Sequence, residues 1–245
     1  MTIDKRSTAA GDVEGRSIGA AALLPTAETV EIGVLLAIVG GFLDAYTFLT
    51  CGGVFANAQS GNVVLLGLEA AQGHFRQALR HLFPIVAFIA GVLFVEALRR
   101  PRVAALVRWP ARVALILEIS ALVIVGLLWR SLPSGVVVVL IAFVASVQIS
   151  AFKTLRGWSY TSTMATGNLM SLTAGWFQRV VARDRQATTK AASFTLITMS
   201  FLLGALLGGV SCLVLGGHAI WVPIVILIAT LVLFVIDDRP RPRLS

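Results

Sequence analysis

Six apolar runs, each close to 20 residues long, constrain this chain more than any other feature of its sequence. A helix needs about 20 consecutive apolar residues to cross the hydrocarbon layer of a bilayer. The runs therefore predict an all-α fold, a polytopic membrane helix bundle of about six transmembrane helices. They occupy approximately residues 31–50, 79–98, 111–130, 133–153, 190–215 and 219–236.

The composition agrees with a surface that faces lipid rather than water. Only 13% of the residues are charged and 57% are hydrophobic, whereas a soluble domain carries about 25% charged residues. The net charge of +8 also occurs in nucleic-acid-binding proteins. Here, however, the basic residues stand in short clusters between apolar runs, and no soluble region is long enough for a binding module. We therefore expect the lipid bilayer, and no nucleic acid, as a partner.

The apolar runs form one membrane domain over residues 31–236. Residues 1–30 are mixed and polar and lack the apolar core of a signal peptide. We therefore expect them to form a disordered cytoplasmic tail. Residues 237–245 are expected to form a second cytoplasmic tail.

Two further segments, at about 57–73 and 161–178, begin with small and polar residues and become apolar only in their second halves. Neither has the continuous apolar length of a membrane span. Each is typical of a non-helical stretch followed by a short, broken or re-entrant helix.

An internal repeat relates the two short segments. Gly61-Asn62 and Gly167-Asn168 are separated by 106 residues, and the same offset superposes the apolar runs of the two halves. Identical residues are few, but the order of elements matches: a span, a short helix and two more spans. The predicted halves are residues 31–130 and 133–236.

The basic residues predict which loops face the cytoplasm, because Lys and Arg are enriched on that side. Five arginines and no acidic residue lie between positions 99 and 112. If the short segments re-enter, this loop, the region 179–190 and both termini are all cytoplasmic. If the short segments span, both termini and the region 179–190 lie outside, against the rule. We therefore expect inverted halves in the inner (plasma) membrane, with the N- and C-termini cytoplasmic.

Interrupted helices in inverted repeats are typical of transporters and channels. A break leaves backbone groups that protein, water or a ligand must satisfy. Glycine permits the turn, and Asn, Ser or Thr can cap the new helix. The alternative is that the two asparagines only cap helices in a packed fold, and both roles are compatible. The candidates for a solute or ion path in the short segments are Ser60, Gly61, Asn62, Thr166, Gly167 and Asn168.

Three polar residues within the apolar runs complete the candidate path. Asp44 and Glu118 are ionisable residues inside predicted spans, where such residues are costly and often functional. Asp44 can bind a cation or a proton, or cap the broken backbone that follows it. Glu118 can instead pair with a basic residue at the cytoplasmic mouth. Gln148 is either a hydrogen-bonding partner between helices or part of the path.

The sequence predicts no enzyme, no cofactor and no metal site. It contains no P-loop or other nucleotide motif, which disfavours an ATP-driven pump. The three histidines lie in or near predicted loops, so a histidine metal site is not expected. Cys51 and Cys212 match no metal spacing and are expected as free thiols, with a disulfide as the alternative.

Two blocks of the sequence carry a resemblance to a known family. The first comprises Gly41–Phe48 (GFLDAYTF), Gly52–Phe55 (GGVF) and Ser60–Asn62 (SGN), and the second comprises Gln148–Lys153 (QISAFK) and Thr161–Leu169 (TSTMATGNL). In these blocks the chain resembles the YoaK family of bacterial membrane proteins, and the resemblance extends over about residues 30–236. It implies a six-span fold and a membrane location, and it gives no substrate.

Three functions are compatible with these features. The leading hypothesis is a secondary transporter or channel for a small solute, with alternating access around a midplane site between inverted repeats. The alternative is a non-catalytic membrane scaffold or assembly factor, although the loops are short. A lipid-acting enzyme is least favoured, because no histidine or carboxylate pair accompanies the Ser and Thr of the short segments. Besides lipid and the solute, a homo-oligomer is a possible partner.

Overall fold

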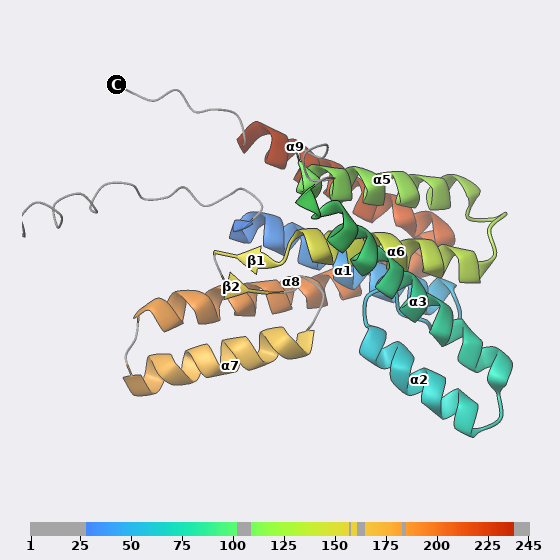
Figure 1. The fold of residues 1–245 in the computed structure, drawn as a ribbon, viewed down its shortest axis with the longest axis horizontal. Coiled ribbons are helices and arrows are strands. Elements are labelled where there is room, and N and C mark those ends of the chain that lie inside the picture. Colours follow the sequence, from blue (N-terminus) through green and yellow to red (C-terminus); the bar gives the residue numbers. More distant parts are fainter. Residues whose placement is uncertain (1–27, 102–108, 157, 161–164, 183–184, 238–245) are drawn as a thin grey trace, which may run out of the picture.

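Long helices lying roughly along one axis dominate the computed structural model of the chain (Figure 1). The structure describes residues 28–101, 109–156, 158–160, 165–182 and 185–237. The tails predicted at 1–30 and 237–245 therefore fall almost entirely outside the described residues.

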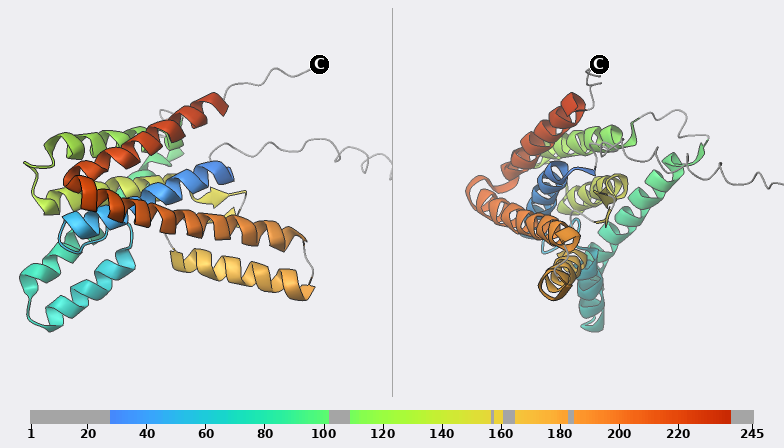
Figure 2. Two further views of the ribbon diagram at one scale, coloured as in Figure 1. Left: turned by 180° about the vertical axis from the view of Figure 1, so that it is seen from behind. Right: turned by 90° about the vertical axis from the view of Figure 1, so that its left-hand side faces the viewer.

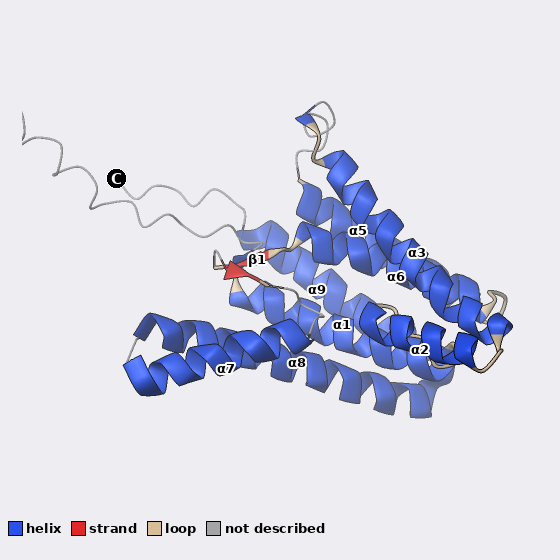
Figure 3. Ribbon diagram, turned by 60° about the horizontal axis from the view of Figure 1, so that its bottom comes forward, coloured by secondary structure: helices blue, strands red, loops and turns tan. Residues whose placement is uncertain are grey.

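Six helices match the six predicted apolar runs. They are α1 (Val30–Thr50), α3 (Phe75–Leu98), α5 (Pro110–Leu128), α6 (Ser134–Ala151), α8 (Arg185–Leu215) and α9 (Trp221–Asp237). Figure 3 shows how little of the described chain is strand or loop. The prediction of an all-α bundle is confirmed.

The described residues contain five helical stretches that are long and apolar enough to cross a bilayer. The last stretch is 50 residues long and includes both α8 and α9. At about 1.5 Å per residue, 50 residues would extend about 75 Å, more than twice the hydrocarbon thickness of about 30 Å. A short 3₁₀ helix, η2 (Gly216–Ile220), turns the chain between α8 and α9, and Gly216 has a φ of +56°. This stretch therefore supplies two crossings, and the bundle has six.

The two short segments are also helical. α2 (Gln59–Ala71) lies within the predicted segment 57–73, and α7 (Ala165–Ala182) extends four residues past the predicted end at 178. Between α6 and α7 the chain forms a small antiparallel hairpin of β1 (Thr154–Leu155) and β2 (Trp158–Ser159), with Leu155 opposite Trp158. The sequence analysis did not predict this hairpin, which is too short to carry an alternating pattern.

Close contacts show that α1 and α8 run parallel. Gly204 of α8 lies against the main chain of Ile38, and Gly208 lies against Phe42, one turn further along both helices. Because the numbers of the contacting residues rise together on both helices, the two helices run in the same direction. Small residues of this kind let two membrane helices approach closely.

The helices α3 and α6 are parallel for the same reason. A side chain at Gly91 would collide with Ser146 and Phe143, so the two helices are in close contact there. Further along, the guanidinium of Arg99 donates a hydrogen bond of 2.6 Å to the carbonyl of Ser150. Residue numbers again rise together on both helices.

The helix α9 is antiparallel to both α1 and α5. Gly126, near the end of α5, packs on Trp221 at the start of α9. The Tyr46 hydroxyl, near the end of α1, donates a hydrogen bond of 3.1 Å to the carbonyl of Gly217, directly before α9. The end of α1 and the end of α5 therefore lie beside the beginning of α9.

The end of α6 lies beside the end of α9, where the rings of Phe152 and Phe234 have centroids 6.3 Å apart. α6 and α9 therefore share one direction. Together these contacts divide the bundle into two sets: α1, α5 and α8 run one way, and α3, α6 and α9 run the other.

This division determines the course of the two short helices. Because α1 and α3 are opposed, the chain enters and leaves the segment that contains α2 on the side of the bundle where α1 ends. Because α6 and α8 are opposed, α7 stays on the side where α6 ends. Figures 1 and 2 show α2 and α7 on the same flank of the bundle, toward opposite ends of its long axis.

The helices α1 and α6 form the centre of the bundle. In their most apolar windows, 67% of α1 and 61% of α6 is buried, against 28–39% of the other spanning stretches. The end-on view in Figure 2 shows α1 and α6 surrounded by the other long helices. Exposed apolar side chains of the outer helices, such as Leu213 and Val225, then face acyl chains and need no protein cover.

The contact between α1 and α8 can be tested with two neighbouring glycines. A Cβ at Gly204 would overlap the Ile38 main chain, whereas nothing lies within 4 Å of a Cβ at Gly209. Overpacking costs roughly 1–3 kcal/mol, so we expect Gly204→Val to lower the melting temperature of the purified protein in detergent. Gly209→Val, with the same change in helix propensity, is expected to leave it nearly unchanged. Equal losses in both variants would contradict the close contact.

Candidate functional site

The segment between α1 and α2 folds back along α1. The Ala56 amide donates to the hydroxyl of Thr47 at 3.1 Å, and the Asn57 side-chain amide donates to the carbonyl of Gly40, also at 3.1 Å. Gly40 precedes Thr50, the end of α1, by ten residues, which is about 15 Å of helix. The start of α2 therefore lies beside the middle of α1, a helix long enough to cross a hydrocarbon layer of about 30 Å.

Asp44 holds this folded-back segment through one carboxylate oxygen. Its Oδ1 accepts hydrogen bonds from the backbone amides of Asn57 at 2.7 Å and Ala58 at 3.4 Å. Amides at the start of a helix lack partners within the helix. The geometry is therefore that of a cap, one of the two roles expected for Asp44. The residue is 5% exposed, and its Oδ2 has no hydrogen-bond partner.

Asn62 secures the turn into α2 from the other side. Its Oδ1 accepts a hydrogen bond from the Phe55 amide at 3.1 Å, and its Nδ2 donates to the Phe55 carbonyl at 2.7 Å and to Oε1 of Gln59 at 2.9 Å. A Cβ at Gly61 would approach the Phe55 ring to 3.0 Å, so a side chain there has little room. Ser60, in the same turn, is exposed.

The beginning of α7 has a similar pattern of burial. Asn168 is buried, whereas Thr166 and Gly167 are exposed. Further along, the indole of Trp176 donates a hydrogen bond of 3.1 Å to the hydroxyl of Thr195 on α8. Residues 161–164, the first part of the predicted segment, lie outside the described residues.

Glu118 and Gln148 form a second buried polar group, between α5 and α6. The Gln148 side-chain amide donates to Oε2 of Glu118 at 2.8 Å, and the two residues are 1% and 0% exposed. Oε1 of Glu118 has no hydrogen-bond partner. Glu118 thus has an uncharged partner in place of the basic residue considered from the sequence. Ionising a carboxyl in such a place, without a counter-charge, would be costly.

The structure brings the predicted candidates into two groups. Asp44 and Asn62 both hold the segment between α1 and α2, and Glu118 pairs with Gln148. No described hydrogen bond links the Asp44 carboxylate to the Glu118 carboxylate. The candidates at exposed or partly exposed positions are Ser60, Gly61, Thr166 and Gly167.

Sequence reasoning missed two members of the first group, Thr47 and Asn57. Thr47 is fully buried and donates to the carbonyl of Leu43 at 3.0 Å while it accepts from the folded-back chain. Asn57 opens the first predicted short segment, where the sequence shows only a polar start. The available signal was spacing, because Thr47 follows Asp44 by three residues and shares its helix face.

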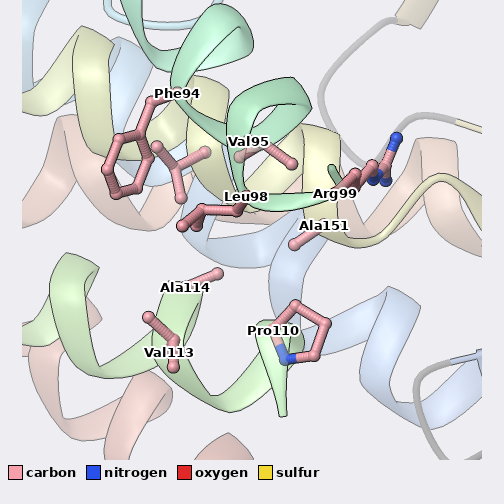
Figure 4. Close-up of a pocket in the computed structure, with 9 residues that line it drawn as sticks. Phe94, Val95, Leu98, Arg99, Pro110, Val113, Ala114 and Ala151 are labelled. Carbon is pink, nitrogen blue, oxygen red and sulfur yellow. The ribbon is translucent and has the colours of Figure 1, made fainter. Parts of the chain in front are cut away.

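An apolar pocket of about 180 Å³ lies between α3, α5 and α6 (Figure 4). None of the predicted site residues lines it. Arg99 is the charged residue in its wall, and this guanidinium also binds Oε1 of Glu96 at 2.9 Å. The remaining lining residues are Phe94, Val95, Leu98, Pro110, Val113, Ala114, Val147 and Ala151.

Among the described residues, no group of three or more His, Cys, Asp or Glu side chains is placed to hold a metal ion. Cys51 and Cys212 are both free, and Cys51 is buried. His74 lies 3.0 Å from the carboxylate of Glu69. Among the buried polar side chains that the structure describes, one is a histidine, His81 of α3, and the others carry carboxyl, amide or hydroxyl groups.

Six apolar crossings with buried carboxyl groups between them define a polytopic helical membrane protein. The chain belongs to the family described as "protein of unknown function (DUF1275)", whose family model matches residues 32–233. It is also similar to the UPF0700 transmembrane protein YoaK of Bacillus subtilis (strain 168), with 28% identity over 200 residues that cover 79% of this chain and 88% of YoaK. The predicted resemblance to the YoaK family is thus confirmed. No solved structure matches the chain.

The role of Asn62 in the turn can be separated from that of its neighbour. Asn62→Ala removes three side-chain hydrogen bonds and leaves both backbone groups of Phe55 without these partners. An unsatisfied buried group costs roughly 1–3 kcal/mol, so we expect a clear loss of unfolding free energy in mixed micelles. Ser60→Ala, at an exposed site of the same turn, should change it by less than about 0.5 kcal/mol. Similar unfolding free energies for both variants would contradict the role of Asn62 in holding the turn.

Proposed function

We propose that the protein is a secondary transporter or channel for a small solute, working by alternating access around a midplane site between two inverted halves. The observation that carries the proposal is the direction of the helices. An offset of 106 residues pairs α1 with α6, α3 with α8 and α5 with α9, and the members of each pair run in opposite directions. Halves related in this way are inverted, as in many secondary transporters.

The packing of the helices supports the same relation. α1 packs on α8 as α6 packs on α3, α2 packs on α3 as α7 packs on α8, and α1 packs on α9 as α6 packs on α5. Exchanging the two halves therefore reproduces the pattern of neighbours. It also accounts for the two central helices, since α1 and α6 are the first helices of their halves.

The two short helices support a site at mid-depth. Gly175 of α7 lies against Ala191 of α8, and α7 begins ten residues earlier, at Ala165. Ten residues further along α8 is Phe201, whose main chain lies against Gly41 of α1. α2 begins at this same level of α1, because its preceding segment binds Gly40. The short helices thus start at a common depth, after approaching from opposite sides.

The chemistry at this level suits coupled transport. The beginnings of two helices carry partial positive charge and favour an anionic or dipolar group. The carboxyl group of Asp44 at this level favours a cation or a proton instead, as does that of Glu118, which lies further along, beside the end of α6. Transporters with broken helices use both kinds of site, one for the solute and one for the coupled ion.

We further propose that the protein lies in the inner (plasma) membrane with both termini in the cytoplasm. The basic residues support this orientation, since they concentrate at the end where α1 begins. The described ones on that side are Arg99, Arg100, Arg112, Lys153, Arg156, Arg179, Arg185 and Lys190, and those on the other side are Arg76, Arg80 and Arg130.

Single cysteines on the two short-helix hairpins test the inverted arrangement. In a background of Cys51→Ala and Cys212→Ala, we expect Gln77→Cys to react with an impermeant maleimide on intact cells. Arg179→Cys should react only after lysis, because α7 approaches from the cytoplasm. Both wild-type side chains are exposed, so the reagent can reach them. Reaction of both from outside would contradict the inverted halves.

A water-filled path distinguishes a transporter from a scaffold. Charged methanethiosulfonate reagents react with thiolates, which form only where water reaches the thiol. We expect Ser60→Cys and Thr166→Cys, at the starts of the short helices, to react in reconstituted vesicles. Ile89→Cys, at a residue 53% exposed on α3, should remain unlabelled because it faces lipid. If neither Ser60→Cys nor Thr166→Cys reacts from either side, the transporter proposal is wrong.

A further inference from the structure

We propose that Asp44 and Asn57 form a proton-binding site, in which a proton on Oδ2 of Asp44 is donated in a hydrogen bond to Oδ1 of Asn57. The proposed transport function enters only in the role of this proton as the coupled ion. The site itself is inferred from the geometry of the two side chains.

Both side chains are anchored to the same turn of α1. The two backbone amides that bind Oδ1 of Asp44 leave Oδ2 as the remaining carboxylate oxygen. The side-chain amide of Asn57 donates to the carbonyl of Gly40, one turn before Asp44. That bond fixes the orientation of the amide and leaves its Oδ1 as the remaining atom. Oδ2 of Asp44 and Oδ1 of Asn57 are both enclosed, and neither has a hydrogen-bond partner.

One proton satisfies both atoms. An ionised carboxylate and an amide oxygen can only accept hydrogen bonds, so the two oxygens cannot bind each other. A protonated carboxyl is a donor through its hydroxyl, and the amide oxygen of Asn57 is an acceptor. Protonation also removes a buried charge, which is costly in a membrane interior. A metal cation fits less well, because hard cations such as Ca²⁺ take six to eight oxygen ligands.

No described charge lies close enough to replace the proton. The other titratable groups near this end of α1 are Tyr46 and Cys51, on or directly after α1, Cys212 on α8, and Arg80 of α3, whose guanidinium lies beside Gly52, eight positions after Asp44. The described salt bridges pair neither Arg80 nor any other basic group with the Asp44 carboxylate. His218 in η2 accepts a hydrogen bond of 3.3 Å from the indole of Trp129.

The charged groups on the elements packed against α1 lie further away. Lys190 is about five turns before Gly208, the residue of α8 that lies against Ala45. Glu31 is at the opposite end of α1. α6 carries no titratable side chain, and Asp237, the last residue of α9, lies at the end of that helix remote from η2.

The proton also has a mechanical consequence. An ionised carboxylate accepts stronger hydrogen bonds from backbone amides than a neutral acid does. Protonation of Asp44 therefore weakens its hold on the amides of Asn57 and Ala58, which fix the start of α2. Release of the proton strengthens that hold. In this way the protonation state is linked to the position of a short helix at mid-depth.

Infrared difference spectroscopy of the full-length protein in lipid vesicles tests the site without any solute. Titration with pH should reveal a carboxylic-acid C=O band that disappears as the pH rises. We expect Asp44→Asn to lack this component. Glu118→Gln, which alters the other buried carboxyl group, should retain it. A spectrum of Asp44→Asn identical to that of the wild type at every pH would overturn the proposal.

Asn57→Ala keeps the test decisive if Asp44→Asn fails to fold. Loss of the acceptor should change the frequency of the Asp44 band, whereas a purely structural role of Asn57 would leave it unchanged and overturn the assignment. At constant pH, NaCl and choline chloride should have the same effect. Removal of the band by Na⁺ alone would identify a metal-cation site instead. If the Asp44 band titrates but neither Ser60→Cys nor Thr166→Cys is labelled, the proton site stands and the transport function is rejected.

Discussion

The hydrogen bonds from the amides of Asn57 and Ala58 to Asp44 are the interaction on which the rest of the structure depends. The chain that leaves α1 turns back into the bilayer, where each unsatisfied backbone group costs several kcal/mol. Asp44 accepts hydrogen bonds from the amides of Asn57 and Ala58, and Thr47 accepts one from the amide of Ala56, so α2 can begin beside the middle of α1. Because the chain then returns along α2 to the side of the bundle where α1 ends, α3 runs opposite to α1. The directions of the later helices follow from that reversal.

The two proposed halves differ in chemistry at corresponding positions. The residue 106 positions after Asp44 is Ser150, which has a hydroxyl in place of a carboxyl group, and its carbonyl accepts a hydrogen bond from Arg99. The second half therefore lacks the carboxylate that caps the returning segment of the first. An asymmetry of this kind suits a transporter in which only one of two related breaks binds the coupled proton, while the other contributes to the solute site.

The helix contacts divide the bundle into two similar units. α1 and α8 pack closely through glycines, and α7 lies on α8. α3 and α6 pack in the corresponding way, with α2 on α3. Each unit thus combines two parallel helices with one short helix. Alternating access would be a rocking of one unit against the other, with the short helices moving as parts of their units.

The sequence by itself determined the six long helices, because the thickness of the bilayer imposes a length that apolar runs reveal directly. It also drew attention to Asp44, Asn62, Glu118 and Gln148, since polar residues are conspicuous in apolar surroundings. Only the tertiary structure decided what these residues bind. The partners of Asp44 and Glu118 lie 13 to 30 positions away in the chain, and no local pattern records such a pairing. The tertiary structure also decided that α2 and α7 return, because a short, half-apolar helix has no length signal and its course depends on the neighbours that satisfy its backbone.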